Sequence, residues 1–411
     1  MKDKALYKEE IKSSLEVKIL SFLITIYAAS QIVFALNPYN KISNFLNLII
    51  MGYYIILYLL DRDGKFFIND IVLAYALFSV FAISSVFWTV DPITSGEKAK
   101  TLFLLVINNL IIYNIFKRFD LGNAFLNGTI LGSFINYLIA FDIIHLSMPT
   151  YLGYRFFGTM GNPNALSITM VLNIAASMIY LQQDIDKKYK IFNVINIILA
   201  FYMIILTVSR TGLILGFFLI TVYVFTMLKD LKRIGYLFLM ISLISIYMLF
   251  FADTAKIYKY FEDISIRLLN VVNTLSGADV EKSTLERKEY IEKGLEMFSN
   301  HPFGGIGIDT FRYYYGGYSH NNFVELLLGV GLIGEILYYS IFALLFVKIS
   351  KIANRDLKLY LYSIVTALLL VDMGSVSYYD KQILLMIIFI GYIAEKYGSE
   401  QKVKKYIKSC R

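Results

Sequence analysis

The chain has 411 residues, of which 57% are hydrophobic and 17% charged, and it carries a net charge of +8 at pH 7. This composition excludes an ordinary water-soluble domain and indicates a polytopic membrane protein. Membrane topology accounts for the positive charge, so we expect no nucleic acid partner. Cys410 is the single cysteine, which excludes a disulfide framework or a thiolate metal site within the chain.

Apolar runs of membrane-crossing length recur along the sequence. About twelve such runs are long enough to cross the hydrocarbon as helices. They cover residues 15–37, 42–60, 68–89, 100–117, 122–146, 164–183, 190–208, 211–228, 234–252, 320–347, 357–375 and 381–397. We therefore predict an all-α, polytopic membrane protein of about 12 transmembrane helices with one large, mostly helical extracytoplasmic loop.

The predicted organisation is one integrated membrane domain. Transmembrane helices 1–9 occupy residues 1–252, the extracytoplasmic loop occupies 253–319, and helices 10–12 with a basic tail occupy 320–411. Lys and Arg are concentrated in alternate connections and in both terminal segments, and such charge is retained in the cytoplasm during insertion. Both termini are therefore expected in the cytoplasm, and the long loop is expected outside.

Several acidic residues fall inside the expected spans, where carboxylates are costly. His145, beside Asp142 in the fifth span, is expected to be a buried, hydrogen-bonded group rather than a catalyst. Glu325, Glu335 and Asp372 lie in later spans. These carboxylates either form a proton or cation path or are satisfied by hydrogen bonds near the outer helix ends.

The first outward-facing candidate is the segment from Tyr151 to Asn164. Its Gly161-Asn162-Pro163-Asn164 run predicts a turn, with Asn164 as the N-cap of the sixth span. Arg155 in the same segment is unusual, because the other short outer loops contain little arginine. We expect Arg155 to be a second-rank contact to phosphate.

Arg210 lies between two apolar runs with almost no loop separating them. A guanidinium at this depth is costly unless it reaches the interface or binds an anion. It is therefore either an anchor to lipid phosphate or a functional group, and we favour function. The planar fork of arginine suits a diphosphate through paired, charge-assisted hydrogen bonds.

The outer loop contains an amphipathic helix. Ser283-Thr284-Leu285-Glu286 has the form of a capping box and predicts its start. Four residues share one face of its helical wheel, namely Arg287, Ile291, Gly294 and Phe298, and the opposite face is charged. Arg287 is therefore expected to point toward protein or ligand rather than bulk water.

Beyond this helix the loop changes character twice. His301, before Pro302, is expected to be a C-terminal cap, and the glycines at 304, 305 and 307 are expected to make a turn. An aromatic run then offers ring faces that suit stacking on sugars. Its members are Phe311, Tyr313, Tyr314, Tyr315 and Tyr318, with Tyr314 and Tyr315 as the substrate-binding candidates.

His320 borders the tenth expected span, at a membrane mouth. A neutral imidazole accepts a proton near pH 7, and Asn321 and Asn322 are available to fix its tautomer. We predict His320 as a general base and Asn321 as a substrate-binding residue. The chain offers no cluster with metal-ligand spacing, so no metal or cofactor is expected.

Taken together, these motifs resemble the O-antigen ligase and polymerase family, which includes the Wzy-type polysaccharide polymerases. The resemblance covers most of positions 155 to 340. It rests on Gly158 to Asn164, Ser209-Arg210, Arg287, His301-Pro302 with the three glycines, and His320-Asn321 followed by Glu325, Gly331 and Gly334. It implies glycan transfer from an undecaprenyl diphosphate carrier, on the outer face of the bacterial cytoplasmic membrane, without metal or nucleotide.

By the same resemblance, Arg210 and Arg287 would hold the diphosphate and His320 would activate the acceptor hydroxyl. These three side chains are expected to converge on one cavity at the outer ends of the helices. Two guanidinium groups suit the charge that grows on the leaving diphosphate. Attack from the opposite face predicts inversion at the anomeric carbon.

Three functions remain in view. We favour a polymerase, whose acceptor is a second lipid-linked repeat unit, whose product is O-antigen or capsule, and whose further partner is a chain-length regulator. The alternative is a ligase that transfers the glycan to lipid A core or to protein. A lipid-linked oligosaccharide transporter is an alternative of another class, supported by the intramembrane carboxylates but not by paired halves with broken helices.

Overall fold

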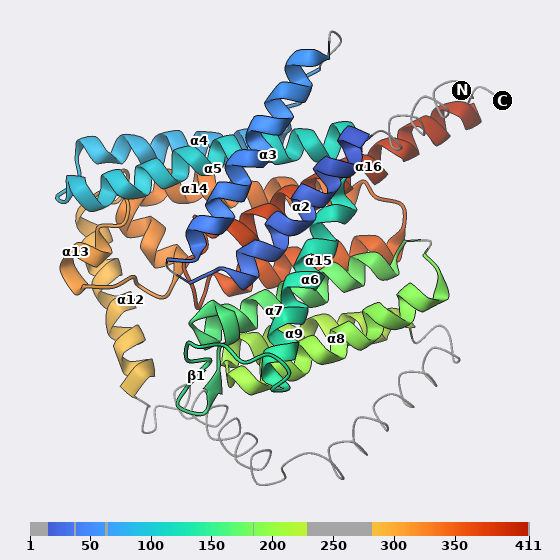
Figure 1. The fold of residues 1–411 in the computed structure, drawn as a ribbon. Helices are drawn as coiled ribbons and strands as arrows, with labels where there is room; N and C mark the ends of the chain where they lie inside the picture. The colour runs from blue at the N-terminus through green and yellow to red at the C-terminus, as the bar shows by residue number, and fades with distance from the viewer. Residues whose placement is uncertain (1–14, 37, 62–64, 184, 228–281, 410–411) are drawn as a thin grey trace. The chain divides into compact units, whose positions relative to one another are not determined.

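The computed structural model describes residues 15–36, 38–61, 65–183, 185–227 and 282–409. These ranges are mostly helical, as the sequence predicts (Figure 1). The helices are α2 (Leu15–Val33), α3 (Asn40–Leu60), α4 (Asp70–Ser84), α5 (Pro92–Phe119), α6 (Gly122–Ala140), α7 (Pro163–Leu181), α8 (Lys187–Thr207), α9 (Arg210–Met227), α12 (Lys282–Asn300), α13 (Phe311–Tyr315), α14 (Asn322–Ser350), α15 (Arg355–Val371) and α16 (Lys381–Ser409).

Seven of the described helices are long and apolar enough to cross a membrane. They are α2, α3, α4 with its 3₁₀ extension to Phe87, α5, α7, α8 and α14. A helix also lies at four other expected spans, as α6, α9, α15 and α16. The ninth expected span, at 234–252, lies outside the described residues, so the count of about twelve stays a prediction.

The helices group into two compact units, residues 1–132 with 286–411, and residues 133–285. In the first unit, α4 packs against α5 and α14, and α16 packs along α5 and α14 (Figure 1). Helices α4 and α14 run antiparallel: Lys348 pairs with Asp70 at 3.0 Å, and the rings of Tyr338 and Phe78 lie 5.1 Å apart. At the Lys348 end, Glu395 also accepts a hydrogen bond from the Tyr113 hydroxyl at 2.6 Å.

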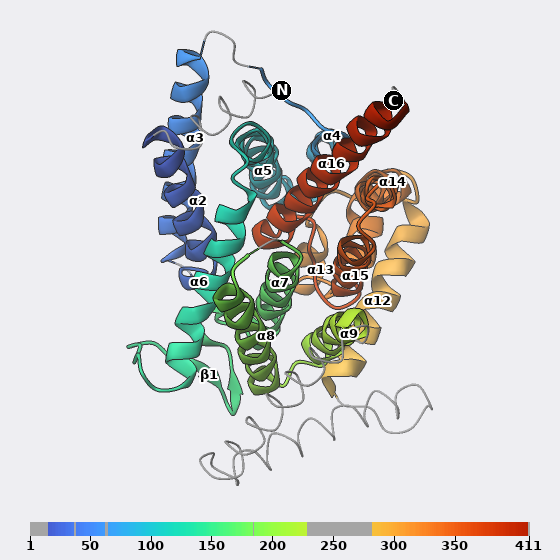
Figure 2. The same ribbon diagram turned by 90° about the vertical axis from the view of Figure 1, so that its right-hand side faces the viewer.

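In the second unit, α7 packs against both α8 and α9 (Figure 2). Several polar side chains buried in this unit, on α6, α7 and α8, are paired with one another. The Tyr137 hydroxyl donates to Asn196 at 2.9 Å, and Asn196 donates to Ser177 at 2.8 Å. A two-stranded antiparallel hairpin, β1 (Tyr151–Leu152) and β2 (Arg155–Phe156), precedes α7.

The prediction for the end of the fifth span is wrong. Helix α6 ends at Ala140, and Asp142 adopts a left-handed conformation with φ 58° that turns the chain out of the helix. The side chains of Asp142 and His145 are 91% and 78% exposed and lie 3.8 Å apart. His145 is therefore an exposed loop residue, not a buried hydrogen-bonded group.

The N-cap of α7 is also two residues earlier than expected. Asn162 accepts hydrogen bonds from the amides of Asn164 and Ala165, at 2.8 and 3.4 Å. Pro163 occupies the first helical turn, where its missing N–H costs nothing, so the cap must precede it. Asn164 is thereby freed for a different contact, described below.

Candidate functional site

The backbone at His320 is held in an uncommon conformation by its neighbours. His320 has φ 58°, a left-handed geometry that is uncommon for residues other than glycine, although histidine adopts it more often than most. The Ser319 amide donates to the Glu325 carboxylate at 2.8 Å, and the Ser319 hydroxyl donates to the Asn321 carbonyl at 2.8 Å. Ser319 is fully buried and Glu325 is 2% exposed, so His320 is mounted on a closed, hydrogen-bonded support.

The His320 imidazole lies in an environment that favours its neutral form. Its ring centroid is 4.2 Å from that of Tyr318, and the side chain is half-buried. Burial, and secondly the positive charge of Arg287, lower the pKa of His320 below its ordinary value of 6.5. At neutral pH the imidazole can therefore accept a proton.

Arg287 comes from the helix face that the sequence predicts. Along α12 the positions of Arg287, Ile291 and Phe298 are half-buried and Gly294 is buried. On the opposite face Glu289, Glu292 and Glu296 are exposed. A Cβ on Gly294 would overlap the Val324 side chain, so glycine permits close packing of α12 on α14. This packing fixes the end of α12 that presents Arg287 to His320.

The two asparagines after His320 make structural contacts at the start of α14. The Asn321 side chain caps α14 by accepting from the Val324 amide at 3.1 Å. Asn322 is fully buried; it donates to Asp372 at 3.2 Å and accepts from the Ser377 amide at 3.0 Å. These contacts fix the start of α14 and give no support to a role of the two amides in setting the His320 tautomer. Substrate binding by Asn321 stays a prediction.

The glycine-rich turn docks on a break in α14. Gly331 has φ 65° and ψ −170°, values that interrupt the helix. The chain at 302–307 inserts there: Leu332 donates to the Pro302 carbonyl at 2.8 Å, and Gly307 donates to the Gly329 carbonyl at 2.9 Å. A Cβ at Gly331 would overlap the Phe303 carbonyl, so this backbone-to-backbone contact requires glycine.

An ion-pair cluster close to Glu325 was not predicted. Lys98, on α5, is 9% exposed; its ammonium lies 3.5 Å from the Asp309 carboxylate and 3.3 Å from the Tyr379 ring centroid. Arg312 approaches the same carboxylate at 3.9 Å. The sequence signal was weak, because Lys98 lies with Glu97 and Lys100 in the polar first turns of α5 and its partners are distant in the chain.

The aromatic run divides into two groups. Phe311 is buried and packs on Tyr315 and Tyr290, with ring centroids 4.6 and 5.5 Å away. Tyr313 and Tyr314 are 60% and 45% exposed, with ring centroids 5.2 Å apart. Tyr315 thus contributes to a small core beneath the loop, while Tyr314 presents a ring outward.

His301 follows α12 directly, as expected for a C-terminal cap. Its amide donates to the Phe298 carbonyl at 2.9 Å, and its carbonyl accepts from Gly305 at 3.1 Å. The side chain is exposed. His301 therefore closes the helix through its backbone.

In the second unit, the Arg155 guanidinium forms hydrogen bonds to other parts of the chain. Its Nε donates to the Thr207 carbonyl at 3.0 Å and its Nη2 donates to the Asn164 side chain at 3.0 Å. Thr207 ends α8, Val208 turns the chain with φ 50°, and Arg210 opens α9. Arg155 therefore ties down the turn that leads into Arg210.

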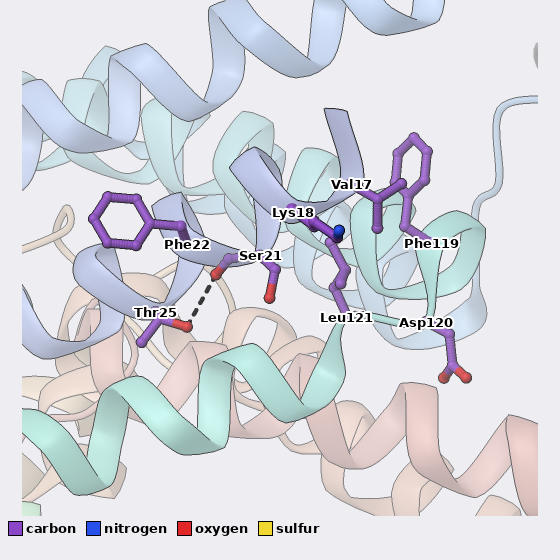
Figure 3. A pocket seen from close by; sticks show the side chains of 8 residues that line it. All are labelled: Val17, Lys18, Ser21, Phe22, Thr25, Phe119, Asp120 and Leu121. Atoms are coloured by element: carbon purple, nitrogen blue, oxygen red, sulfur yellow. Dashed lines mark hydrogen bonds between the residues drawn. The ribbon is translucent and has the colours of Figure 1, made fainter. Parts of the chain in front are cut away.

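A cavity of about 430 Å³ lies in the first unit at the opposite end of α5 from Lys98 (Figure 3). It is lined by α2 and by the α5–α6 connection, including Lys18, Phe22 and Asp120. The Asp120 carboxylate pairs with Lys396 at 2.5 Å. None of the predicted site residues lines this cavity.

Comparison with known proteins gives one match to a protein family. Residues 195–339 match the family model described as O-antigen ligase. The matched stretch contains Arg210, Arg287 and His320 and ends within α14, whereas Arg155 lies before it. No curated protein matches the chain. The match confirms the family resemblance of the motifs.

Proposed function

Because residues 195–339 match the O-antigen ligase family model, we propose that this membrane protein is a glycosyltransferase that uses a polyprenyl-diphosphate-linked glycan as donor. The carrier is undecaprenyl diphosphate, and the acceptor is the hydroxyl of a second lipid-linked repeat unit. The reaction takes place on the outer face of a bacterial cytoplasmic membrane. Its product is a longer chain of O-antigen or capsule.

His320 is the proposed general base, and its environment is the observation that carries the proposal. The imidazole is half-buried, packs on Tyr318, and has its pKa lowered by burial and by Arg287. A base with a pKa below 6.5 is neutral at pH 7 and ready to take a proton. The support from Ser319 and Glu325 keeps its position fixed.

The proposed step exchanges one bond for another. The acceptor oxygen forms a bond to the anomeric carbon of the donor glycan while the bond from that carbon to the diphosphate oxygen breaks. His320 takes the hydroxyl proton, and the electron pair of the broken bond leaves with the diphosphate. Attack opposite the leaving group inverts the anomeric carbon.

Arg287 and Arg210 are the proposed diphosphate contacts. Negative charge grows on the leaving diphosphate, and guanidinium groups stabilise it through paired hydrogen bonds. The role of Arg287 is supported by its positive charge, which lowers the pKa of His320. The role of Arg210 is supported by its position in the matched stretch and by the preceding turn, which Arg155 holds through a hydrogen bond. That Arg210 and His320 lie in one site is part of the proposal.

The polymerase is favoured over the ligase by the exposed rings of Tyr313 and Tyr314, which suit a glycan acceptor. The ligase is the second candidate, because the matched family is described as O-antigen ligase. Both share the same chemistry and differ in the acceptor, so the product distinguishes them.

The transporter alternative keeps only part of the support that its intramembrane carboxylates gave. Glu325 accepts from the Ser319 amide, and Asp372 accepts from the hydroxyl of Tyr339 at 3.0 Å and from Asn322. Asp142 is exposed in a loop. Glu325 and Asp372 therefore have local structural partners. Glu335 differs, because its Oε2 is buried without a hydrogen-bond partner in the described part of the chain, so this carboxylate is the remaining support for a proton or cation path.

The test is a reaction with defined components. Purified protein in lipid vesicles is incubated with a single lipid-linked repeat unit, and products are separated by size. A ladder of longer lipid-linked glycans supports the polymerase. A product that forms only when lipid A core or a protein acceptor is added supports the ligase, and a donor left unchanged under both conditions contradicts glycosyl transfer.

A further inference from the structure

The lengths of helices α4 and α14 can be compared with the thickness of the membrane hydrocarbon. The Asp70–Lys348 ion pair fixes one end at 3.0 Å. At the other end, Trp88 donates through its indole N–H to the Gly304 carbonyl at 3.2 Å, beside the break at Gly331. The helical stretch from Asp70 to Phe87 has 18 residues. At 1.5 Å per residue it is about 27 Å long, close to the roughly 30 Å of bilayer hydrocarbon.

The break in α14 divides that helix at the same level. The whole of α14 has 29 residues, which is about 43 Å and longer than the hydrocarbon requires. The part after Gly331 is about 28 Å long and matches α4. The first nine or so residues, which include Glu325, therefore lie beyond the length that the membrane can cover.

Exposed apolar side chains gather at this level. Phe87 is 92% exposed, Ile93 78%, Phe303 68% and Trp88 43%. We call these four residues the rim. They come from the end of α4, the start of α5 and the glycine-rich turn, and the Trp88–Gly304 hydrogen bond joins two of those segments. Large exposed apolar groups beside a tryptophan are typical of the membrane–water interface.

We propose that the rim rests in the interfacial region of one lipid leaflet and marks the outer limit of the hydrocarbon. His320, Glu325 and the first two turns of α14 then stand beyond the acyl chains, at the height of the lipid headgroups. This depth is independent of the proposed reaction. If the proposed function holds as well, it places the general base level with the diphosphate of a membrane-bound carrier.

Trp88 is the only tryptophan in the chain, so its fluorescence reports the depth of the rim without any substitution. The full-length protein is reconstituted in vesicles with phospholipids brominated either close to the headgroup or near the acyl-chain end. We expect the shallow bromines to quench Trp88 more than the deep ones. A Trp88→Phe, Phe303→Trp variant should show the same order.

Leu77 offers a matched control on the same helix, because its side chain is 52% exposed near the middle of α4. A Trp88→Phe, Leu77→Trp variant should be quenched more by the deep bromines. Stronger deep quenching of Trp88 itself would place the rim and Glu325 within the hydrocarbon and overturn the proposal. Quenching of Trp88 by aqueous iodide, with none by either bromolipid, would overturn it as well.

Discussion

Replacing Gly331 with alanine tests whether the break in α14 anchors the glycine-rich turn. The residue has φ 65° and ψ −170°, a region that is essentially restricted to glycine. An added Cβ would overlap the Phe303 carbonyl and the Gly304 amide nitrogen lies only 2.7 Å from its position. The turn must therefore move, or the helix must close.

The cost follows from two contributions. Forcing alanine into this conformation costs about 1–3 kcal/mol, and losing the Leu332–Pro302 hydrogen bond costs about another 1 kcal/mol. We expect Gly331→Ala to lower the free energy of unfolding by about 2–4 kcal/mol. It should also change the Trp88 emission, because Trp88 donates to the Gly304 carbonyl in the displaced turn.

The assay is thermal unfolding in detergent followed by Trp88 fluorescence. Gly96→Ala is the matched control: Gly96 lies within α5, no atom lies within 4 Å of its added Cβ, and alanine favours a helix there. That variant should be at least as stable as the original protein, with unchanged emission. If Gly331→Ala were equally stable with unchanged emission, the anchoring role of the break would be refuted.

Three further predictions concern the candidate site. Arg287→Gln removes a positive charge that lowers the pKa of His320, so the acidic limb of the rate–pH profile should move to higher pH. An unchanged acidic limb would show that Arg287 does not act on the general base. Glu325→Ala leaves the buried Ser319 amide unpaired, a cost of about 1–3 kcal/mol, and should slow turnover on the order of tenfold, whereas Glu325→Gln keeps an acceptor and should stay close to the original rate. Arg155→Ala loses two hydrogen bonds and should lower stability by about 1–3 kcal/mol in thermal unfolding; weaker donor binding with unchanged stability would instead favour the phosphate contact first predicted.

The features that the sequence predicts well are those governed by local periodicity. The buried face of α12 follows from the spacing of Arg287, Ile291, Gly294 and Phe298 alone. The helices of the described spans follow from apolar runs. The end of α6 was missed because Phe141, Ile143 and Ile144 extend the apolar run after Asp142 has already turned the chain.

The features that the sequence could not reveal depend on contacts between distant segments. Lys98 pairs with Asp309 only because α5 packs beside the loop. Asn322 forms hydrogen bonds with Asp372 and Ser377 of the α15–α16 connection. Nothing in the local pattern at His320 distinguishes an asparagine that sets a tautomer from one that fixes a helix start. The support of His320 by Glu325 likewise requires the left-handed turn to be formed first.

The proposal that Arg210 shares one site with Arg287 and His320 is tested most directly by paired cysteines. In a Cys410→Ser background, cysteines replace residues 210 and 320, and a short thiol-reactive cross-linker is applied to membranes. Cysteines at 287 and 320 serve as the positive control, because Arg287 acts on His320 in the structure. We predict that both pairs cross-link; cross-linking of the 287–320 pair without any of the 210–320 pair would contradict the shared site.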